Sequence, residues 1–433
     1  MRIWSGFGMN MTPLNGSNKV VVVGGGAAGM MAAGMAAQAG AQVTLLEQNG
    51  RLGKKLLITG KGRCNVTNDC PWQDVLQNVP TNPRFLYSAL AGFSPADSKQ
   101  FFETYGCALK TERGNRVFPV SDRSQSVLDA LERFLREQHV RVLPRRAEQI
   151  AVSDGRISGV KTAEGPVPAD CVILATGGLS YPATGSTGSG YAMAKALGHT
   201  IIEPTGSLVP LVEKGHDCAR MQGLALKNIA VKLVNAKGKS VYEDFGELLF
   251  THFGLSGPVI LSASSHMARG EDGYTVRIDL KPALDEKTLD ARILRDFSAA
   301  QNRDFENSLS ALLPKSMIPV VIARSGIDPA QKVNSITKQQ RRALLETIKC
   351  FSVPIACKAP VEDAIVTSGG VKVSEVNAKT MESKKIAGLI FAGELLDVDA
   401  YTGGFNLQIA WATGRLAGLS AAAKEFQSPE DAT

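Results

Sequence analysis

The sequence contains no block of five or six like charges, although its 48 lysines and arginines exceed its 41 aspartates and glutamates. The resulting net charge of +7 is spread thinly over 433 residues. Such a mild excess fits a protein that handles anions and does not by itself indicate nucleic acid. Aromatic residues make up only 6% of the chain, and no tract interleaves them with basic residues. We therefore expect no nucleic-acid partner.

The sequence also lacks any CxxC pair, and its seven cysteines are an odd number. These features argue against a disulfide framework and against a zinc site. The five histidines show no metal-ligand spacing, and no Ser-His-Asp arrangement can be read from the chain. We therefore expect reduced thiols, a cytoplasmic location and no metal.

A long uninterrupted apolar segment is missing as well. Residues 1–18 lack the apolar core of a secretory signal, so we interpret them as a loose leader. The stretch from Val20 to Leu46 has no charged residue, but several glycines and two glutamines interrupt it. A strand, a turn and a helix explain this stretch better than a membrane-spanning helix. We expect no membrane partner, and the sequence leaves the oligomeric state open.

What the sequence does contain begins with a glycine fingerprint. Residues 20–23 (VVVV) form a β-branched run, as expected for a strand buried on both faces. Gly24-x-Gly26-x-x-Gly29 follows at once, and after an alanine-rich helix a second strand ends at Glu47. In a dinucleotide site the first glycine permits the tight turn and the second lets the backbone approach a pyrophosphate. The third lets helix and strand pack closely.

The acid at the end of the second strand completes this pattern. Glu47 lies 21 residues after Gly26, where a carboxylate accepts hydrogen bonds from the adenosine ribose hydroxyls. The pyrophosphate then lies at the positive end of the helix, where we expect Ala27 and Ala28 beside it, with Gln48 next to the acid. A strand before, a helix after and an acid at the right distance together make a strong signal for a dinucleotide.

Five basic residues lie between positions 51 and 63 on a glycine-containing backbone. A Walker A loop needs GxxxxGK[ST], and this stretch departs from it at two positions. It contains no aromatic residue for base stacking. We interpret it as a basic loop that folds back over the dinucleotide. The NH groups of Gly60 and Gly62 would reach cofactor oxygens, and Lys54, Lys55 or Arg63 would balance the diphosphate.

The segments GGGAAG…LLEQ and GRLGKKLLITGKGRCNVTN together resemble the BaiN-like family of flavoproteins, which includes enzymes described as aminoacetone oxidases. That resemblance covers nearly the whole chain after residue 18. It implies an FAD cofactor and places Gly62, Arg63, Cys64 and Asn65 close to the flavin ring. Cys64 has two interpretations: a redox-active thiol, or a packed small residue, which is the commoner role of a free cysteine without a CxxC partner.

Two further segments are typical of FAD enzymes. The strand CVIL ends in an ATGG turn, and the resemblance assigns a cofactor contact to Ala175, Thr176 and Gly177. Near the carboxyl end, a strand–turn–helix aims an acid at the ribityl chain and a helix N-terminus at the flavin pyrimidine edge. The candidates there are Gly393, Glu394, Gly404, Phe405 and Asn406. Thr367, Gly369 and Gly370 are expected to approach the flavin from the other side.

These motifs predict an α/β protein with a Rossmann-like FAD-binding domain formed by both chain ends. We expect this domain to comprise residues 19–204 and 355–433. Short strands and turns predict a β-rich insert at 205–283 that binds substrate, and a charged helical pattern predicts a helical subdomain at 284–354. The glycine-rich stretch 181–199 is not followed by a parallel strand ending in an acid, so no separate nicotinamide domain is expected.

The sequence thus indicates a soluble FAD-dependent oxidoreductase in which a small organic substrate exchanges hydride with flavin N5. The second redox partner is either oxygen, as in amine oxidation, or transiently bound NAD(P)H, as in reduction of an enone-like double bond. The catalytic acid or base is not determined, and the weak candidates are Cys64, His252 and Tyr401. The alternatives are an RNA-linked, tRNA-modifying flavoprotein and a flavin-binding protein with little turnover.

Overall fold

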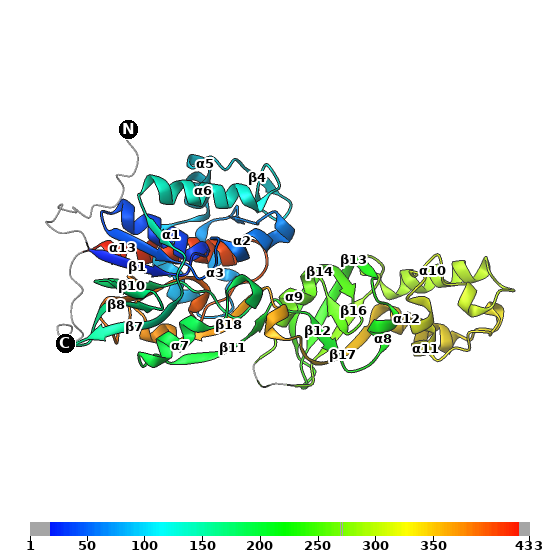
Figure 1. Ribbon diagram of the computed structural model, residues 1–433. Helices are drawn as coiled ribbons and strands as arrows, with labels where there is room; N and C mark the ends of the chain where they lie inside the picture. Colours follow the sequence, from blue (N-terminus) through cyan, green and yellow to red (C-terminus); the bar gives the residue numbers. More distant parts are fainter. Residues whose placement is uncertain (1–17, 269, 271, 424–433) are drawn as a thin grey trace.

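The computed structural model describes residues 18–268, 270 and 272–423, so the expected leader lies almost entirely outside the described residues. Three bodies follow one another along the length of the molecule (Figure 1). A large α/β domain contains both ends of the described chain, a β-barrel is joined to it, and a helical subdomain lies beyond the barrel. The predicted fold class, a Rossmann-like α/β domain with a β-rich insert, is confirmed.

The α/β domain is built on a five-stranded parallel sheet with the order β19-β10-β1-β2-β6. Its strands are β1 (Lys19–Val23), β2 (Gln42–Leu46), β6 (Arg141–Leu143), β10 (Cys171–Leu174) and β19 (Leu389–Phe391). The valine run of β1 is buried on both faces, because helices pack on one face of the sheet and a small antiparallel sheet formed by residues 147–168 packs on the other. The two ends of the chain therefore build one sheet, with β1 at its centre.

Two long helices cover one face of this sheet, α1 (Ala27–Gln38) and α13 (Phe405–Ala422). They approach so closely that a Cβ on Gly414 or Gly418 would lie 2.5 or 2.3 Å from carbonyl oxygens of α1. Most of α13 is buried, and Trp411 is fully enclosed. Small residues are needed along α13 because it packs against several elements at once.

The remainder of this domain consists of further helices and two small antiparallel sheets, for which the sequence analysis made no prediction. The helices are α2 (Lys54–Ile58), α3 (Trp72–Gln77), α4 (Tyr87–Gly92), α5 (Pro95–Thr104), α6 (Ser124–Glu137) and α7 (Ser189–Ala196). The strands are β3 (Thr67–Asn68), β4 (Leu109–Glu112), β5 (Arg116–Pro119), β7 (Ala147–Ser153), β8 (Arg156–Thr162) and β9 (Gly165–Pro168). One continuous hydrophobic core unites these elements with the central sheet.

A closed six-stranded barrel follows, with the order β12-β15-β14-β13-β16-β17. Its strands are β12 (Leu211–Glu213), β13 (Ala225–Val234), β14 (Ser240–Phe250), β15 (Gly254–Ser256), β16 (Thr275–Asp279) and β17 (Phe351–Lys358). Two short helices accompany them, α8 (Asp217–Arg220) and α9 (Pro258–Ser264). The strand β17 crosses the boundary that we expected at 354/355, because the barrel closes with a strand that follows the helical subdomain.

The helical subdomain contains α10 (Glu286–Ser298), α11 (Ile318–Ser325) and α12 (Lys338–Lys349). It shares one hydrophobic core with the barrel, separate from the core of the α/β domain. The antiparallel pair β11 (Ile201–Ser207) and β18 (Val366–Val371) carries the chain between the two cores. No helix in the described part of the chain is long and apolar enough to cross a membrane.

Candidate active site

A cavity of about 1280 Å³ lies over the carboxyl ends of the central strands, where Val23, Leu46 and Ala175 line it. Ligands of open α/β sheets bind at this edge. The cavity extends from there to the junction with the barrel, where Leu208, Pro258 and Leu261 contribute to its wall. Its volume exceeds the roughly 300–1,000 Å³ of common small-molecule sites, so it has room for a large cofactor and a second ligand.

The three fingerprint glycines have different surroundings. Gly24 has a φ of +104°, and an added Cβ would lie 2.6 Å from the Ala175 carbonyl oxygen. A Cβ on Gly29 would lie 1.8 Å from the Gly24 oxygen, which shows how tightly helix α1 packs on the turn. A Cβ on Gly26 would meet nothing within 4 Å, and this residue lines the cavity. The open space over Gly26 fits a group that approaches the backbone, as a pyrophosphate does.

Glu47 lines the cavity but is already bonded through both carboxylate oxygens. One oxygen accepts from the backbone NH of Gly25 at 2.7 Å, and the other accepts from the NH and side chain of Asn49 at 2.8 and 2.7 Å. Each carboxylate oxygen can accept a second hydrogen bond. The acid therefore supports the glycine turn, and its contact with a ribose remains a prediction. Ala27, Ala28 and Gln48 also line the cavity.

The basic stretch is not a simple loop. Residues 54–58 form the short helix α2, since Lys and Leu favour helices and Leu56 buries its side chain. Beyond it, Gly60 and Lys61 both adopt positive φ values and line the cavity, whereas Gly62 does not line it. The Lys54 ammonium donates to the Asn49 side-chain oxygen at 2.9 Å. Lys54 therefore keeps its charge available for an anionic ligand.

Arg63 has carboxylate partners that the sequence did not indicate. Its guanidinium pairs with Glu112 and Asp122, and it lies 4.1 Å above the ring of Phe118. The hydrogen bonds to these carboxylates, that of Glu112 foremost, raise the pKa of Arg63. Arg63 lines the cavity, but its charge is already balanced, which disfavours the predicted role of countering a diphosphate.

Cys64 lies in the hydrophobic core and does not line the cavity. Burial raises the pKa of its thiol to about 12, so the thiolate needed for redox chemistry is disfavoured. This placement favours the packed-residue interpretation over the redox one. The neighbouring Asn65 does line the cavity, and its side chain accepts from the Val117 NH at 3.1 Å.

In the middle segment, Ala175, Thr176 and Gly177 all line the cavity. The Thr176 hydroxyl is buried and has no hydrogen-bond partner among the described residues. This hydroxyl faces Gly190 of helix α7 and not the cavity, so it does not mark a ligand contact.

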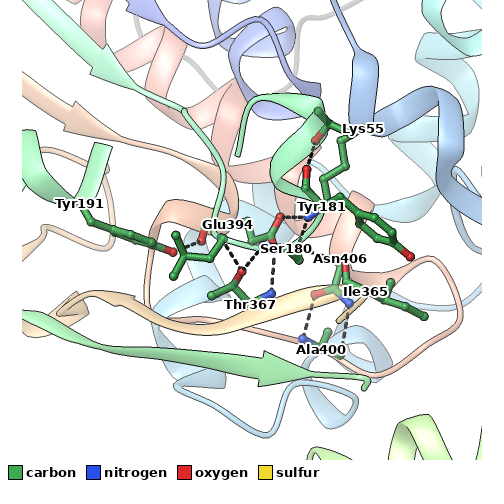
Figure 2. A network of polar contacts seen from close by, with 11 residues as sticks. Lys55, Ser180, Tyr181, Tyr191, Ile365, Thr367, Glu394, Ala400 and Asn406 are labelled. Atoms are coloured by element: carbon green, nitrogen blue, oxygen red, sulfur yellow. Dashed lines mark hydrogen bonds and ion pairs between the residues drawn. The ribbon is translucent and has the colours of Figure 1, made fainter. Parts of the chain in front are cut away.

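Glu394 is the centre of a polar network that joins four distant segments (Figure 2). One carboxylate oxygen accepts from the Lys55 ammonium at 2.7 Å. The other accepts from the Ser180 hydroxyl at 3.0 Å and the Thr367 NH at 2.8 Å. The Lys55 ammonium also donates to Ser180 at 2.6 Å. Lys55 therefore forms a half-buried ion pair with Glu394, and both residues of the pair line the cavity. This pairing disfavours the predicted role of Lys55 as a counter-charge for the diphosphate.

Three residues expected to approach the flavin from the other side lie elsewhere. Thr367 is fully buried, and its hydroxyl accepts from the Leu179 NH at 2.8 Å. Gly369 and Gly370 pack against the backbones of other segments, and an added Cβ would lie 2.5 and 2.4 Å from carbonyl oxygens there. None of the three lines the cavity. The two glycines allow close backbone packing around β18. The expectation that these three residues approach the flavin was therefore wrong.

The N-terminus of α13 faces the cavity through Gly404, Phe405 and Asn406. Gly404 has a φ of +98°, and a Cβ there would lie 2.4 Å from the Thr67 oxygen. The Asn406 side chain bonds both the NH and the oxygen of Ala400, at 2.9 and 2.7 Å, so it positions the preceding loop (Figure 2). Gly393 does not line the cavity and packs against α1 instead.

Of the two remaining catalytic candidates, Tyr401 lines the cavity and His252 does not. His252 is an exposed residue in a turn of the barrel, where its ring meets Phe253 edge-on. A different histidine, His266, stacks on Tyr401 with ring centroids 5.1 Å apart. The sequence analysis missed His266, because it belongs to no motif and lies 135 positions from Tyr401.

The charge of the cavity wall is mainly positive. Seven basic side chains line it against three acidic ones, and two of the basic ones, Arg145 and Arg146, follow the edge strand β6 and were also missed. Such a wall suits an anionic ligand. Within residues 18–268, 270 and 272–423, no cluster of three or more His, Cys, Asp or Glu side chains is placed to hold a metal ion.

A parallel sheet with a glycine turn, a cavity over its carboxyl edge and three chain segments around that cavity define a dinucleotide-binding fold of the kind that oxidoreductases use. Residues 18–420 match the model of the HI0933-like protein Rossmann domain, so the chain belongs to this family and is an FAD-dependent oxidoreductase. The expected resemblance to BaiN-like flavoproteins is thereby confirmed.

Two curated relatives support this assignment, and one solved structure shares the fold alone. A 3-dehydro-bile acid delta(4,6)-reductase from Clostridium scindens is 36% identical over 413 residues, covering 94% of this chain and 99% of that protein. A ribosomal RNA dihydrouridine synthase from Escherichia coli is 31% identical over 395 residues, covering 91% and 95%. The 3-ketosteroid delta1-dehydrogenase of Sterolibacterium denitrificans shares the fold, with a TM-score of 0.51, 14% identity and 94% and 100% coverage.

Proposed function

We propose that this protein reduces a carbon–carbon double bond conjugated to a carbonyl group, with FAD as the hydride carrier. The names of its relatives support this choice. One reduces a 3-dehydro bile acid, whose enone system is conjugated, and the other makes dihydrouridine, for which a uracil double bond beside a carbonyl must be reduced. The two substrates differ in size and charge, but the bond that is reduced is of the same kind.

The residues around the cavity fit an extended dinucleotide. The NH groups of the Gly24–Gly29 turn and the start of α1 would hold the diphosphate, with Lys54 nearby as a counter-charge. Glu47 and Arg145 would hold the adenosine end. The N-terminus of α13 would face the ring edge, where negative charge develops when the ring is reduced. When bound, FAD supplies the ring that carries the hydride.

The observation that carries the proposal is the apolar end of the cavity at the domain junction. Pro258 and Leu261 come from α9, beside the barrel, and Leu208 comes from the link between β11 and β12. Val366 begins β18, and Ile365 is the residue before it. Apolar walls exclude water and hold a flat, weakly polar substrate against the ring. The junction therefore supplies the binding surface, and the α/β domain supplies the cofactor.

A reductase needs an electron donor, and we propose NAD(P)H that binds transiently in the same open cavity. The chain carries one dinucleotide fingerprint, which FAD would occupy, so NAD(P)H would have no site of its own. It would therefore bind in the open cavity first, reduce the flavin and leave before the substrate binds. Amine oxidation with oxygen is the competing half-reaction, and the experiment below separates the two. The cytoplasm, where NAD(P)H is available, stays the proposed compartment.

A second candidate is the reduction of uracil within ribosomal RNA. The basic side chains of the cavity wall other than the ion-paired Lys55 and Arg63 favour it, as do the net charge of +7 and the names of two relatives. These relatives weaken the expectation that nucleic acid has no part in the function. RNA binding through phosphate contacts predicts an affinity that falls steeply with salt, whereas a neutral enone predicts little salt dependence.

The test follows the visible spectrum of the purified, FAD-loaded protein without oxygen. We expect NADH or NADPH to bleach the flavin bands and an enone acceptor to restore them. The acceptors are androstenedione, a steroid with a conjugated enone, and an unmodified ribosomal RNA transcript. Failure to bind FAD, or bleaching by primary amines alone with no reoxidation by either acceptor, would refute the proposal. Recovery with RNA but not with the steroid would establish the second candidate.

A further inference from the structure

Three rings form a column that runs from the barrel to the cavity. Tyr242 lies on β14, His266 follows α9, and Tyr401 belongs to the loop before α13. The Tyr242 and His266 centroids are 4.5 Å apart, and the His266 and Tyr401 centroids are 5.1 Å apart with 21° between the planes. Tyr401 lines the cavity, and the other two rings do not. The column therefore links Tyr401, which lines the cavity, to two rings from the barrel side.

We propose that the Tyr401 hydroxyl donates the proton that completes the reduction and that His266 is its positioning residue. This inference rests on the proposed function. In the reaction, the hydride that reduced FAD would supply adds to the carbon β to the carbonyl, and the π electrons shift toward the carbonyl oxygen. A new C–H bond then forms at the α carbon as the Tyr401 O–H bond breaks. Water returns a proton to the tyrosinate.

The surroundings keep Tyr401 in its protonated form. Burial, foremost, and the nearby Asp399 raise the pKa of Tyr401 above its ordinary value of about 10. The other titratable groups that face the ring column are His266, Tyr242 and Asp244, which accepts from the Tyr242 hydroxyl at 2.7 Å. Burial lowers the pKa of His266, so this ring is neutral and does not favour a tyrosinate. The phenol is thus available as an acid and not as a base.

The geometry also holds the phenol in place. The backbone NH of Tyr401 donates to the Asn78 oxygen at 2.9 Å, and its oxygen accepts from Asn406 at 3.3 Å. His266 Nε2 is buried without a partner among the described residues, so the imidazole supports Tyr401 through ring stacking. Within the described chain, no side chain is hydrogen-bonded to the Tyr401 hydroxyl. That hydroxyl is free to meet a ligand.

The first test uses Tyr401→Phe, which keeps the ring stack and removes the proton. A proton donor typically contributes about 10²–10⁴-fold, so we expect reoxidation of the NADPH-reduced enzyme by the acceptor to slow at least about 100-fold. Bleaching by NADPH and the FAD affinity should stay within about twofold, because the phenol takes no part in either. Tyr87→Phe is the matched control, since that exposed hydroxyl lies outside the cavity.

A second readout does not depend on rate. In D₂O the wild type should place deuterium at the α carbon in a single configuration, and Tyr401→Phe should scramble it. His266→Phe keeps a stacking ring and should retain the single configuration, whereas His266→Ala should scramble it with FAD binding intact. The acceptor is androstenedione, or the RNA transcript if only that is reduced.

The outcomes separate this inference from the proposed function. If neither acceptor reoxidises the reduced wild type, the proposed function fails and the inference fails with it. If the wild type turns over and Tyr401→Phe matches it in rate and in label configuration, the inference alone fails. If His266→Phe loses activity as fully as Tyr401→Phe, the imidazole is the donor and the assignment of Tyr401 is wrong.

Discussion

The fingerprint glycines allow the fold and the cofactor site to be perturbed separately. Gly29→Ala would place a methyl group 1.8 Å from the Gly24 oxygen, although side-chain Cβ atoms essentially never come closer than 3.0 Å to such an atom. Helix α1 would have to move about 1.2 Å from the turn. Gly26→Ala adds the same methyl group to open space above the cavity, at a φ of −83° that alanine adopts freely.

The expected magnitudes follow from these distances. Overpacking against a rigid backbone atom costs about 3 kcal/mol, so Gly29→Ala should lower the melting temperature of the α/β domain by roughly 6–12 °C. Gly26→Ala slightly weakens the cap of helix α1, but it also reduces the conformational freedom of the unfolded chain. Because these effects oppose each other, the free energy of unfolding should change by less than about 1 kcal/mol. The added methyl group would hold the pyrophosphate off the backbone and weaken FAD binding at least about tenfold, or about 1.4 kcal/mol.

The assay combines thermal unfolding of both apo-proteins, followed by circular dichroism, with FAD titration monitored by flavin fluorescence. The wild type is the reference for both variants. We expect Gly29→Ala to melt early and Gly26→Ala to melt normally but bind FAD weakly. The assignment of roles would be refuted if Gly26→Ala bound FAD like the wild type, or if Gly29→Ala kept the wild-type melting temperature.

Two further predictions follow from the site. In the native protein, iodoacetamide at pH 8 should label the exposed Cys350 and Cys357 but not the buried Cys64. Burial raises the pKa of Cys64 to about 12, so at pH 8 it stays in the unreactive, protonated form. Mass spectrometry of the peptides decides this, and labelling of Cys64 before unfolding would contradict its placement. Lys55→Met and Glu394→Gln should each destabilise the protein, and the double variant should show a coupling energy of about 1 kcal/mol in urea unfolding. Additive effects would mean that the ion pair contributes nothing.

The cofactor end of the site could be predicted from the sequence because its signals are local. The valine run, the spacing of three glycines and the acid 21 residues after the second glycine define a strand, a turn, a helix and a second strand without any distant contact. The different surroundings of Gly24, Gly26 and Gly29 follow the expected division of roles. Both chain ends meet in one sheet, as their strand patterns indicated.

The partners of individual side chains could not be predicted in the same way. Arg63 meets Glu112 at the end of β4 and Asp122 in the turn after β5, neither of which belongs to a motif, so its charge is balanced by protein rather than by cofactor. A pattern specifies which residues reach a turn, but it does not specify which distant carboxylates fold against them. The same holds for Cys64, whose neighbours in the core decide that it is buried.

The cofactor end of the cavity is formed by one domain, whereas the substrate end is formed where two domains meet. The fingerprint lies wholly within the α/β domain, whereas the apolar end of the cavity and the His266–Tyr401 stack need the barrel to lie against it. Relatives with matching full-length chains carry the names of a bile acid reductase and an RNA-modifying enzyme, so the shared fold does not select between their substrates. We therefore expect residues at the junction, such as Leu208, Pro258 and Leu261, to determine which conjugated double bond is reduced. Exchanging these side chains should change the choice of acceptor while the affinity for FAD stays the same.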